Sequence, residues 1–595
     1  MLCFLPLATV LILTTIRWER YGDIRVDFGS ELAVAWQITE GKHLYTDIAY
    51  FKGPLSPHWN ALMMYIFGVS VHTIVLANMT IIAAIAYGIR QLAGMTMHRA
   101  VATALACIFI IVFGFSTSYE VNVFNFVTPF VHELTHGIAL SIGVFIALER
   151  WIRKPEIRTT VEGGLCFGLA LLTRVEIAFA LSAAILTWFI AMKRQKISRK
   201  IIAKHIGIFG ACTITIPLIA ILLLNRTMPM DQALSSTFAS FKALLTTDVA
   251  RSPFFLHISG WDRPLRSIAS QGASILILAF YGIMFYAAAD AWDGKSYGFG
   301  IIIAAATLSG MLLLAYYNIP PFYFGSVLLL STIVITCSGI LQARRFPNLA
   351  TYRTMTFVGV YSLILLTKIL LVPSTDFYGF AHGMPAYLLF VAVLFSVPSM
   401  LIQRFQLAST SVFLSSLIIG MIVIEISATL RLDQRLIATK TLAFGNPPDR
   451  MFVTPTTINL ALHAFFEKAP TLIPPGSTLT VVPEGVMLNY LLRQPLGTPY
   501  LNFMVTEYCI FGKENIEGSF ATHRPDFILL THKYTSEFGY PLFGKMPEYG
   551  ADVMTWLKRE YGQIALFGEQ PLTSKDSEGV ALWRRKDFLE TSSRN

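Results

Sequence analysis

The sequence predicts a polytopic α-helical membrane protein that ends in a soluble α/β domain. Of its 595 residues, 54% are hydrophobic and only 14% are charged, whereas a soluble globular chain carries about 25% charged residues. Many apolar runs reach the roughly 20 residues that a bilayer-crossing helix needs. This composition continues to about residue 427 and then changes, so we expect a membrane module over 1–427 and a soluble domain over 428–595.

The apolar runs predict about thirteen membrane helices. They lie at 2–16, 73–93, 97–115, 132–150, 162–173, 177–192, 202–224, 267–289, 297–316, 321–341, 354–372, 386–402 and 408–427. The first run has neither a basic leader nor a small-residue cleavage site, so it is interpreted as a membrane helix and not as a cleaved signal.

Basic residues between the runs predict the orientation, because cytoplasmic loops are enriched in Lys and Arg. Three basic loops contain Arg150, Arg153, Lys154 and Arg158; Lys193, Arg194, Lys196, Arg199, Lys200 and Lys204; and Arg344, Arg345 and Arg353. The first two loops lie on the same side of the membrane only if the segment 162–192 between them is a hairpin of two short helices. With all three inside, the loops 17–72, 116–131 and 225–266 and the tail lie outside. The net charge of +10 is thus interpreted as a topology signal.

The tail has the alternating pattern of a small α/β layer structure. STLTVVPEG, RPDFILLTHK and GVALWRR are predicted as strands, and ADVMTWLKREYG is predicted as an amphipathic helix. The turn Pro483-Glu484-Gly485 is interpreted as structural. The six cysteines are scattered, and five lie in apolar runs, so no disulfide framework is expected.

The most polar segment near the start is the loop 17–72. Asp27 and Glu31 are four residues apart and would share one helix face if 28–39 is helical, and Asp47 and Lys52 follow. A carboxylate at a membrane surface can act as a general base toward an acceptor hydroxyl or amine, or hold a divalent metal. A lysine can neutralise a phosphate leaving group. The alternative is a solvated loop with ordinary surface charges.

Several segments resemble the polytopic GT-C glycosyltransferases, especially bacterial members related to dolichyl-phosphate-mannose protein mannosyltransferases and lipopolysaccharide-core sugar transferases. These segments are DFGSELAVAWQITEGKHLYTDIAYFKGPLSPHWNALMMYIFG, YEVNVFNFVTPFVHELTHGIALS, GLALLTRVEIAFA and FYGFAHGMP. Tyr50-Phe51-Lys52-Gly53-Pro54 matches the family's aromatic–Lys/Asn–Pro pattern before a helix. The resemblance covers the whole chain as a pattern, although no single motif is diagnostic.

The resemblance implies an inverting transfer of a sugar from a polyprenyl-phosphate-linked donor to an extracytoplasmic glycan, lipid or protein, at a bacterial inner membrane. It implies Asp27 as the catalytic base, with Glu133 or Glu120 as a second acidic residue. Further candidates for substrate binding are Lys52, Glu31, Asp47, Tyr50, His58, His136, Arg174, Glu176, Arg263 and His382. For these, ordinary alternatives stay open: a salt bridge between Arg174 and Glu176, helix capping by His382, and headgroup contact by Arg263.

Many members of this superfamily carry two adjacent acidic residues in the first outer loop, whereas here Asp27 is followed by Phe28. A divalent cation as cofactor is therefore left open.

Two other functions compete. His132, Glu133 and His136 form the H-E-x-x-H pattern of zinc peptidases, in which two histidines one turn apart bind the metal, but the sequence offers no third ligand motif. A transporter or flippase of a lipid-linked substrate would commonly show repeated halves with broken helices, and no internal repeat is evident.

Overall fold

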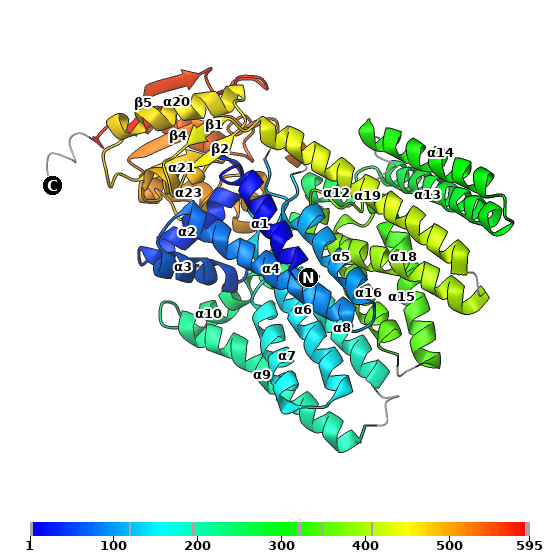
Figure 1. Cartoon of the computed structure of the whole chain (residues 1–595). Coiled ribbons are helices and arrows are strands. Elements are labelled where there is room, and N and C mark those ends of the chain that lie inside the picture. Colours follow the sequence, from blue (N-terminus) through cyan, green and yellow to red (C-terminus); the bar gives the residue numbers. More distant parts are fainter. Residues whose placement is uncertain are drawn as a thin grey trace.

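The computed structural model shows a bundle of helices with a sheet-containing domain at one end (Figure 1). The structure describes residues 4–117, 119, 121–192, 197–317, 324–346, 349–405 and 408–588. Its first ten helical segments are α1 (Leu5–Arg17), α2 (Phe28–Thr39), α3 (Leu55–Phe67), α4 (Val71–Gly94), α5 (Arg99–Phe109), the π-helix η1 (Ile110–Gly114), α6 (His132–Arg153), α7 (Ile157–Leu171), α8 (Val175–Met192) and α9 (Arg199–Leu224).

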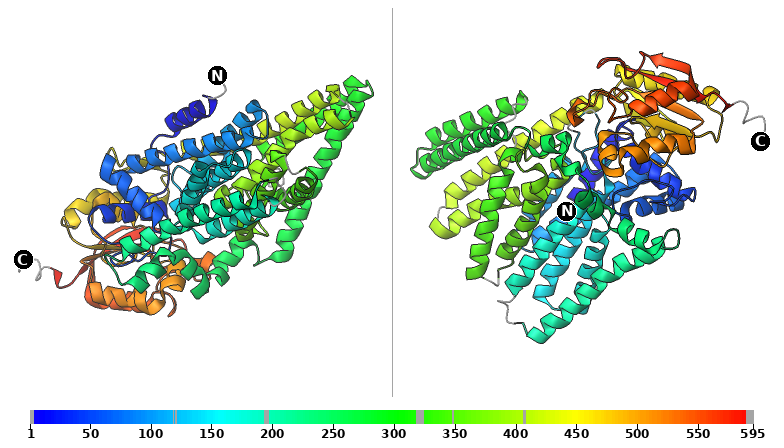
Figure 2. Two further views of the ribbon diagram at one scale, coloured as in Figure 1. Left: turned by 90° about the horizontal axis from the view of Figure 1, so that it is seen from below. Right: turned by 180° about the vertical axis from the view of Figure 1, so that it is seen from behind.

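The second half of the bundle contains short surface helices as well as long ones. Its segments are α10 (Met230–Thr237), α11 (Ala239–Thr246), η2 (Val249–Arg251), α12 (Pro253–Ser259), α13 (Pro264–Asp293), α14 (Tyr297–Tyr316), η4 (Phe324–Val327), α15 (Leu328–Arg345), α16 (Ala350–Leu366), η5 (Thr367–Ile369), α17 (Gly379–His382), α18 (Met384–Phe405) and α19 (Ala408–Ala438). Helices α13, α14 and α19 pack on one another and project from one side of the bundle (Figure 2).

Apolar residues explain where these helices lie. The outer helix α9 exposes Ile214, Leu218 and Leu222, four residues apart on one face, as expected of a surface in contact with lipid. Helix α6 lies in the centre of the bundle and buries both apolar and polar side chains, His132 and Glu133 among them. The bundle thus hides its ionisable groups and presents hydrocarbon to the bilayer.

Each of the thirteen predicted spans falls on a helix, but their number as complete spans is not confirmed. Among the described residues, seven helices are long and apolar enough to cross a membrane: Val71–Gly94, His132–Arg153, Arg199–Leu224, Pro253–Asp293, Tyr297–Tyr316, Gly325–Arg345 and Thr410–Ala438. Four shorter apolar helices accompany them: Leu5–Arg17, Arg99–Gly114, Val175–Ile190 and Met384–Pro398.

The chain leaves the bundle through α19 and then forms the sheet-containing domain. This domain contains β1 (Leu442–Phe444), β2 (Met451–Val453), α20 (Thr457–Leu472), β3 (Leu479–Val482), α21 (Met487–Leu492), α22 (Val505–Phe511), α23 (Lys513–His523), β4 (Phe527–Thr531), η6 (Ser536–Phe538), α24 (Ala551–Glu560), β5 (Tyr561–Gly568) and β6 (Gly579–Arg585). The expected strands within STLTVVPEG, RPDFILLTHK and GVALWRR and the helix within ADVMTWLKREYG are all confirmed.

The main sheet has four strands in the order β3-β4-β6-β5. Strands β3 and β4 are parallel, with Leu479 opposite Phe527, while β4, β6 and β5 pair antiparallel. Strand β4 is buried along its whole length, which explains its unbroken apolar sequence. A separate two-stranded pair, β1-β2, belongs to the same domain.

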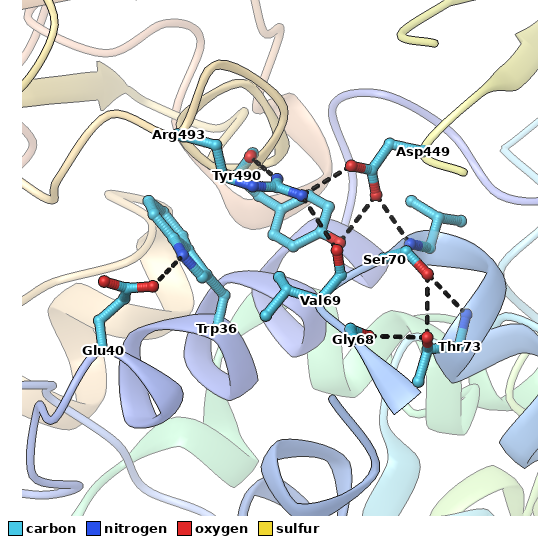
Figure 3. Close-up of polar contacts among 10 residues, drawn as sticks. Trp36, Glu40, Gly68, Val69, Ser70, Thr73, Asp449, Tyr490 and Arg493 are labelled. Carbon is cyan, nitrogen blue, oxygen red and sulfur yellow. Dashed lines mark hydrogen bonds and ion pairs between the residues drawn. The ribbon is translucent and has the colours of Figure 1, made fainter. Parts of the chain in front are cut away.

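The C-terminal domain packs directly on α2. A Cβ on Gly29 would lie 2.5 Å from the Cβ of Met487 in α21, so the missing side chain lets the two helices approach closely. Nearby, Arg493 forms an ion pair with Asp449 at 2.6 Å and lies over the ring of Tyr490, with the ring of Trp36 of α2 next to both (Figure 3). The domain is therefore anchored to α2 of the bundle.

Candidate active site between the helical bundle and the C-terminal domain

A cavity of about 370 Å³ lies where the bundle meets the C-terminal domain. Its walls come from the start of α2, the segment 49–52, Tyr119 and the segment 121–131, α12, the region around Tyr378, and the domain segments 501–511 and 533–538. These are mostly loops and helix ends at the domain side of the bundle. The cavity therefore brings together residues separated by up to about 500 positions in the chain.

Asp27 lies at the N-terminal end of α2 and lines this cavity. Its φ and ψ angles are +30° and −54°, a strained backbone conformation. The side chain is half-buried because it faces the cavity. Burial, followed by the negative charge of Glu484, raises the pKa of the Asp27 carboxyl to about 7. A carboxyl with this pKa can exchange protons near neutrality.

Three more carboxylates reach the cavity from the C-terminal domain: Glu484, Glu507 and Glu537. Glu484 is buried and forms an ion pair with Lys533 at 3.2 Å, and this neighbour raises the pKa of Lys533. Burial raises the pKa of Glu507 to about 8. The domain thus contributes a buried acid–base pair and a carboxyl that is largely protonated at neutral pH.

The lining also contains cations. Arg174, from the corner between α7 and α8, and Lys368, from η5, both line the cavity. Each forms an ion pair with the same carboxylate, that of Glu176, at 3.1 and 2.7 Å respectively. Two cations that share one anion leave a net positive charge beside the cavity, which favours a bound phosphate.

The lysine Lys52 completes the polar lining. Its ammonium group is 2.7 Å from Glu31, whose other carboxylate oxygen is 3.1 Å from a ring nitrogen of His132. Burial alone would raise the pKa of Glu31, but the charge of Lys52 and the contact with His132 outweigh it and lower that pKa to about 2. Glu31 is therefore a buried anion that fixes Lys52, and it does not itself line the cavity.

Backbone contacts hold the loop around Lys52 in place. The N–H groups of Gly53 and Leu55 donate to the carbonyls of Thr173 and Leu172 at 3.1 and 3.2 Å. A Cβ on Gly53 would lie 2.1 Å from the Leu172 oxygen, so only glycine permits this approach. The neighbouring Tyr50 lines the cavity and donates a short hydrogen bond to Glu133.

Aromatic rings form much of the remaining wall. Phe124 packs on Phe377 with centroids 4.4 Å apart, and Phe130 packs on Tyr378 at 5.1 Å. Phe254 of α12 stacks on Phe538 of the domain at 4.5 Å. Carboxylates next to aromatic faces suit a polyhydroxylated ring, whose hydroxyls donate hydrogen bonds and whose C–H faces pack on aromatic rings.

The predicted site residues divide into two groups. Asp27, Tyr50, Lys52 and Arg174 line the cavity. Glu31, Glu133, Glu176 and His382 do not line it but each contacts a lining residue.

The other predicted site residues lie elsewhere. Asp47 and His58 are exposed and bond to the backbone of His43 and Pro54. His136 is buried beside Ser56, and Arg263 lines a different pocket. Glu120 lies outside the described residues.

The H-E-x-x-H segment does not have the geometry of a metal site. Both ring nitrogens of His132 already have protein partners, Glu31 and Asn78, and Glu133 is bonded to Tyr50. Within the described ranges, no group of three or more His, Cys, Asp or Glu side chains could hold a metal ion. His132 and Glu133 therefore act as hydrogen-bonding groups inside the bundle.

Five lining residues with charged groups were missed by the sequence interpretation: Lys368, Glu484, Glu507, Lys533 and Glu537. The sequence pattern places Glu484 in a structural turn, yet its side chain reaches the cavity. Lys368 offered a usable signal, because an ionisable residue within a predicted span is a functional candidate by default. The domain residues offered none, since nothing local shows that they face α2.

No family model and no curated protein sequence matches this chain. Among solved structures, the chain is similar to the Archaeoglobus fulgidus oligosaccharyltransferase in complex with Zn and sulfate, with 11% identity, a TM-score of 0.48, and coverage of 88% of this chain and 67% of the other. It is also similar to ArnT from Cupriavidus metallidurans bound to undecaprenyl phosphate, with 11% identity, a TM-score of 0.48 and 98% coverage of both chains.

A third similar structure is the archaeal oligosaccharyltransferase AglB from Archaeoglobus fulgidus, in complex with an inhibitory peptide and a dolichol-phosphate. It shares 12% identity at a TM-score of 0.46, over 89% of this chain and 69% of the other.

Proposed function

We propose that the protein is a membrane glycosyltransferase that moves a sugar from a polyprenyl-phosphate-linked donor to an acceptor hydroxyl or amine. The observation that carries this proposal is one cavity lined by a carboxyl with a pKa of about 7, Asp27, and by the cations Arg174, Lys368 and Lys52. A base on one side and a phosphate site on the other are what a displacement at an anomeric carbon requires.

In this mechanism Asp27 accepts the proton of the acceptor hydroxyl or amine as the acceptor attacks the anomeric carbon. The new bond to the sugar forms while the bond between the anomeric carbon and the phosphate oxygen breaks. The electron pair leaves with the polyprenyl phosphate, whose added negative charge Arg174 and Lys368 stabilise. Attack from the face opposite the phosphate inverts the anomeric configuration. The same steps serve a hexose or a pentose.

We also propose that the membrane is a bacterial inner membrane and that the C-terminal domain and the cavity are extracytoplasmic. One feature supports this orientation. The ends of α9 and α15 that carry Arg199 and Arg345 lie at the end of the bundle opposite the domain (Figure 1), and such residues favour the cytoplasm. Reporter fusions at residues 200 and 588 should give opposite signals; a cytoplasmic domain would refute the orientation.

Lys368 provides the test of the phosphate site. The variant Lys368→Ala leaves Glu176 paired with Arg174, so the fold should be retained. We expect the apparent KM for polyprenyl-phosphate sugars to rise at least tenfold, with a smaller fall in kcat. The control is Lys42→Ala, an exposed lysine of the same outer side that does not line the cavity. Transfer by wild-type protein in proteoliposomes must first be seen, and unchanged kinetics in Lys368→Ala would contradict the proposal.

A further inference from the structure

A second pocket, of about 390 Å³, lies beside the central cavity. It is formed by the end of α12, the start of α13, η4 and the loop after η5. Helix α12 separates the two sites: Phe254 and Phe255 line the central cavity, whereas His257 lines this one. Helix α12 therefore lies between the second pocket and the proposed reaction site.

Its polar lining is basic. Arg263, Arg266 and His257 line the pocket, and Asp262 is its one acidic lining residue in the part of the chain that the structure describes. The Asp262 carboxylate is 2.8 Å from His257 and 4.0 Å from Arg263. Among the described residues, Arg266 forms no ion pair. Excess positive charge thus faces the pocket, and the N-terminal end of the 30-residue helix α13 adds to it.

The face of α13 that points away from the pocket-lining residues is apolar and exposed. Leu265 and Ile268 of α13 are 83% and 55% exposed, and Trp261, just before this helix, is 53% exposed. Val372, which lines the pocket, is also exposed. These residues belong to, or adjoin, the segment Pro253–Asp293, which is apolar enough to cross a membrane. Tryptophan is typical of the membrane–water boundary, so the pocket opens where headgroups meet acyl chains.

We infer that this pocket binds the phosphate headgroup of a membrane lipid, and that it prefers a phosphate monoester. Cations next to an exposed apolar helix face match an amphiphilic anion better than free phosphate. A phosphate monoester carries roughly one and a half to two negative charges near pH 7, whereas the diester of a bulk phospholipid carries about one. Two arginine forks can hold its three terminal oxygens.

This inference adds a step that follows the proposed reaction, and this added step rests on the proposed function. Polyprenyl phosphate, the product released by the proposed reaction, is a lipid phosphate monoester. Its headgroup can pass from Lys368 in the central cavity to Arg263 and Arg266 while its chain stays in the bilayer. The pocket would then hold the spent carrier away from the site and leave the cavity free for the next donor.

The test measures lipid binding without turnover, so it is independent of whether transfer is observed. Full-length protein is titrated in detergent with undecaprenyl phosphate, phosphatidylglycerol or inorganic phosphate, and bound lipid is counted by native mass spectrometry. The variant Arg263→Ala/Arg266→Ala is compared with Lys242→Ala/Arg251→Ala, which removes two cations of the same region that line neither site.

We expect the Arg263→Ala/Arg266→Ala protein to bind undecaprenyl phosphate at least tenfold more weakly at one of two sites, with the control unchanged. Lys368→Ala should weaken the other site only, which separates the pocket from the central cavity. Equal binding by both double variants would overturn the inference. Displacement of the lipid by millimolar inorganic phosphate would also overturn it, because the site would then bind free anions. Equal retention of phosphatidylglycerol would overturn the preference for a monoester.

Discussion

Replacing Asp27 by Asn is the most informative perturbation of the proposed active site. The amide keeps the size of the carboxyl, and Asn accepts the positive φ of this position about as well as Asp. The change removes only the proton acceptor and its charge. If Asp27 is the general base, kcat should fall by about 100-fold to 10,000-fold. Donor binding should change little, because Arg174 and Lys368 hold the phosphate.

The pKa of Asp27 predicts the pH profile of the wild-type enzyme. With a pKa of about 7, roughly a tenth of the side chain is ionised at pH 6, half at pH 7 and nine-tenths at pH 8. The rate should therefore fall about tenfold per pH unit below neutrality and level off above pH 8. Glu484→Gln removes the neighbouring charge that helps to raise this pKa, so the acidic limb should move to lower pH.

The assay follows transfer from a mixed pool of polyprenyl-phosphate sugars in proteoliposomes between pH 5 and 9. Glu40→Gln is the matched control: Glu40 is exposed, accepts a hydrogen bond from Trp36 and lies outside the cavity. Two results would refute the reasoning. One is a folded Asp27→Asn protein with wild-type turnover. The other is an acidic limb that stays in place in Glu484→Gln, since the limb would then report a different group.

Four further predictions concern stability. The pKa of Asp27 is higher in the folded state than in the unfolded chain, so the stability of the wild-type protein should fall as pH rises from about 4 through 7. Asp27→Asn should therefore have a higher Tm than the wild type at pH 8. Equal wild-type Tm values at pH 4 and pH 8 would contradict this prediction. Lys52→Met removes the lysine that pairs with the buried Glu31 and should lower the free energy of unfolding by about 3–5 kcal/mol. The double variant Lys52→Met/Glu31→Gln should recover part of this loss, as measured by denaturant titration. Gly53→Ala should lower both Tm and activity, because its Cβ would lie 2.1 Å from a carbonyl oxygen; wild-type behaviour would rule out so close an approach of the two loops. Arg493→Ala should speed proteolytic release of the C-terminal domain, since it breaks the ion pair with Asp449; an unchanged cleavage rate would show that this pair contributes little.

The sequence predicted the helices because their apolar runs are local signals. The position of α2 also followed from local pattern, and Asp27 and Lys52 were identified from a loop whose charges stand out against apolar surroundings. Because all of the runs are similarly apolar, their composition could not show which helices cross the membrane completely. Length decides that, and Arg99–Gly114 and Val175–Ile190 are shorter than a bilayer requires.

The rest of the site depends on contacts between distant segments. Glu484 follows a strand and looks like an ordinary turn residue, and only the packing of α21 on α2 brings it to the cavity beside Asp27. Similarly, His136 carries a motif that suggests metal binding, but its environment gives it Ser56 as partner. A side chain's neighbours across the fold, and not its motif, decided both cases.

The close approach of Gly29 to Met487 and the contact between Trp36 and Arg493 have a mechanical consequence (Figure 3). Helix α2 is held from both sides: Glu31 contacts Lys52 and His132 of the bundle, while Gly29 and Trp36 pack on the C-terminal domain. A shift of that domain would therefore strain the contacts of Glu31 and move Asp27 relative to Arg174 and Lys368, which belong to the bundle. The relative position of the base and the cations thus depends on how firmly the domain is seated on α2.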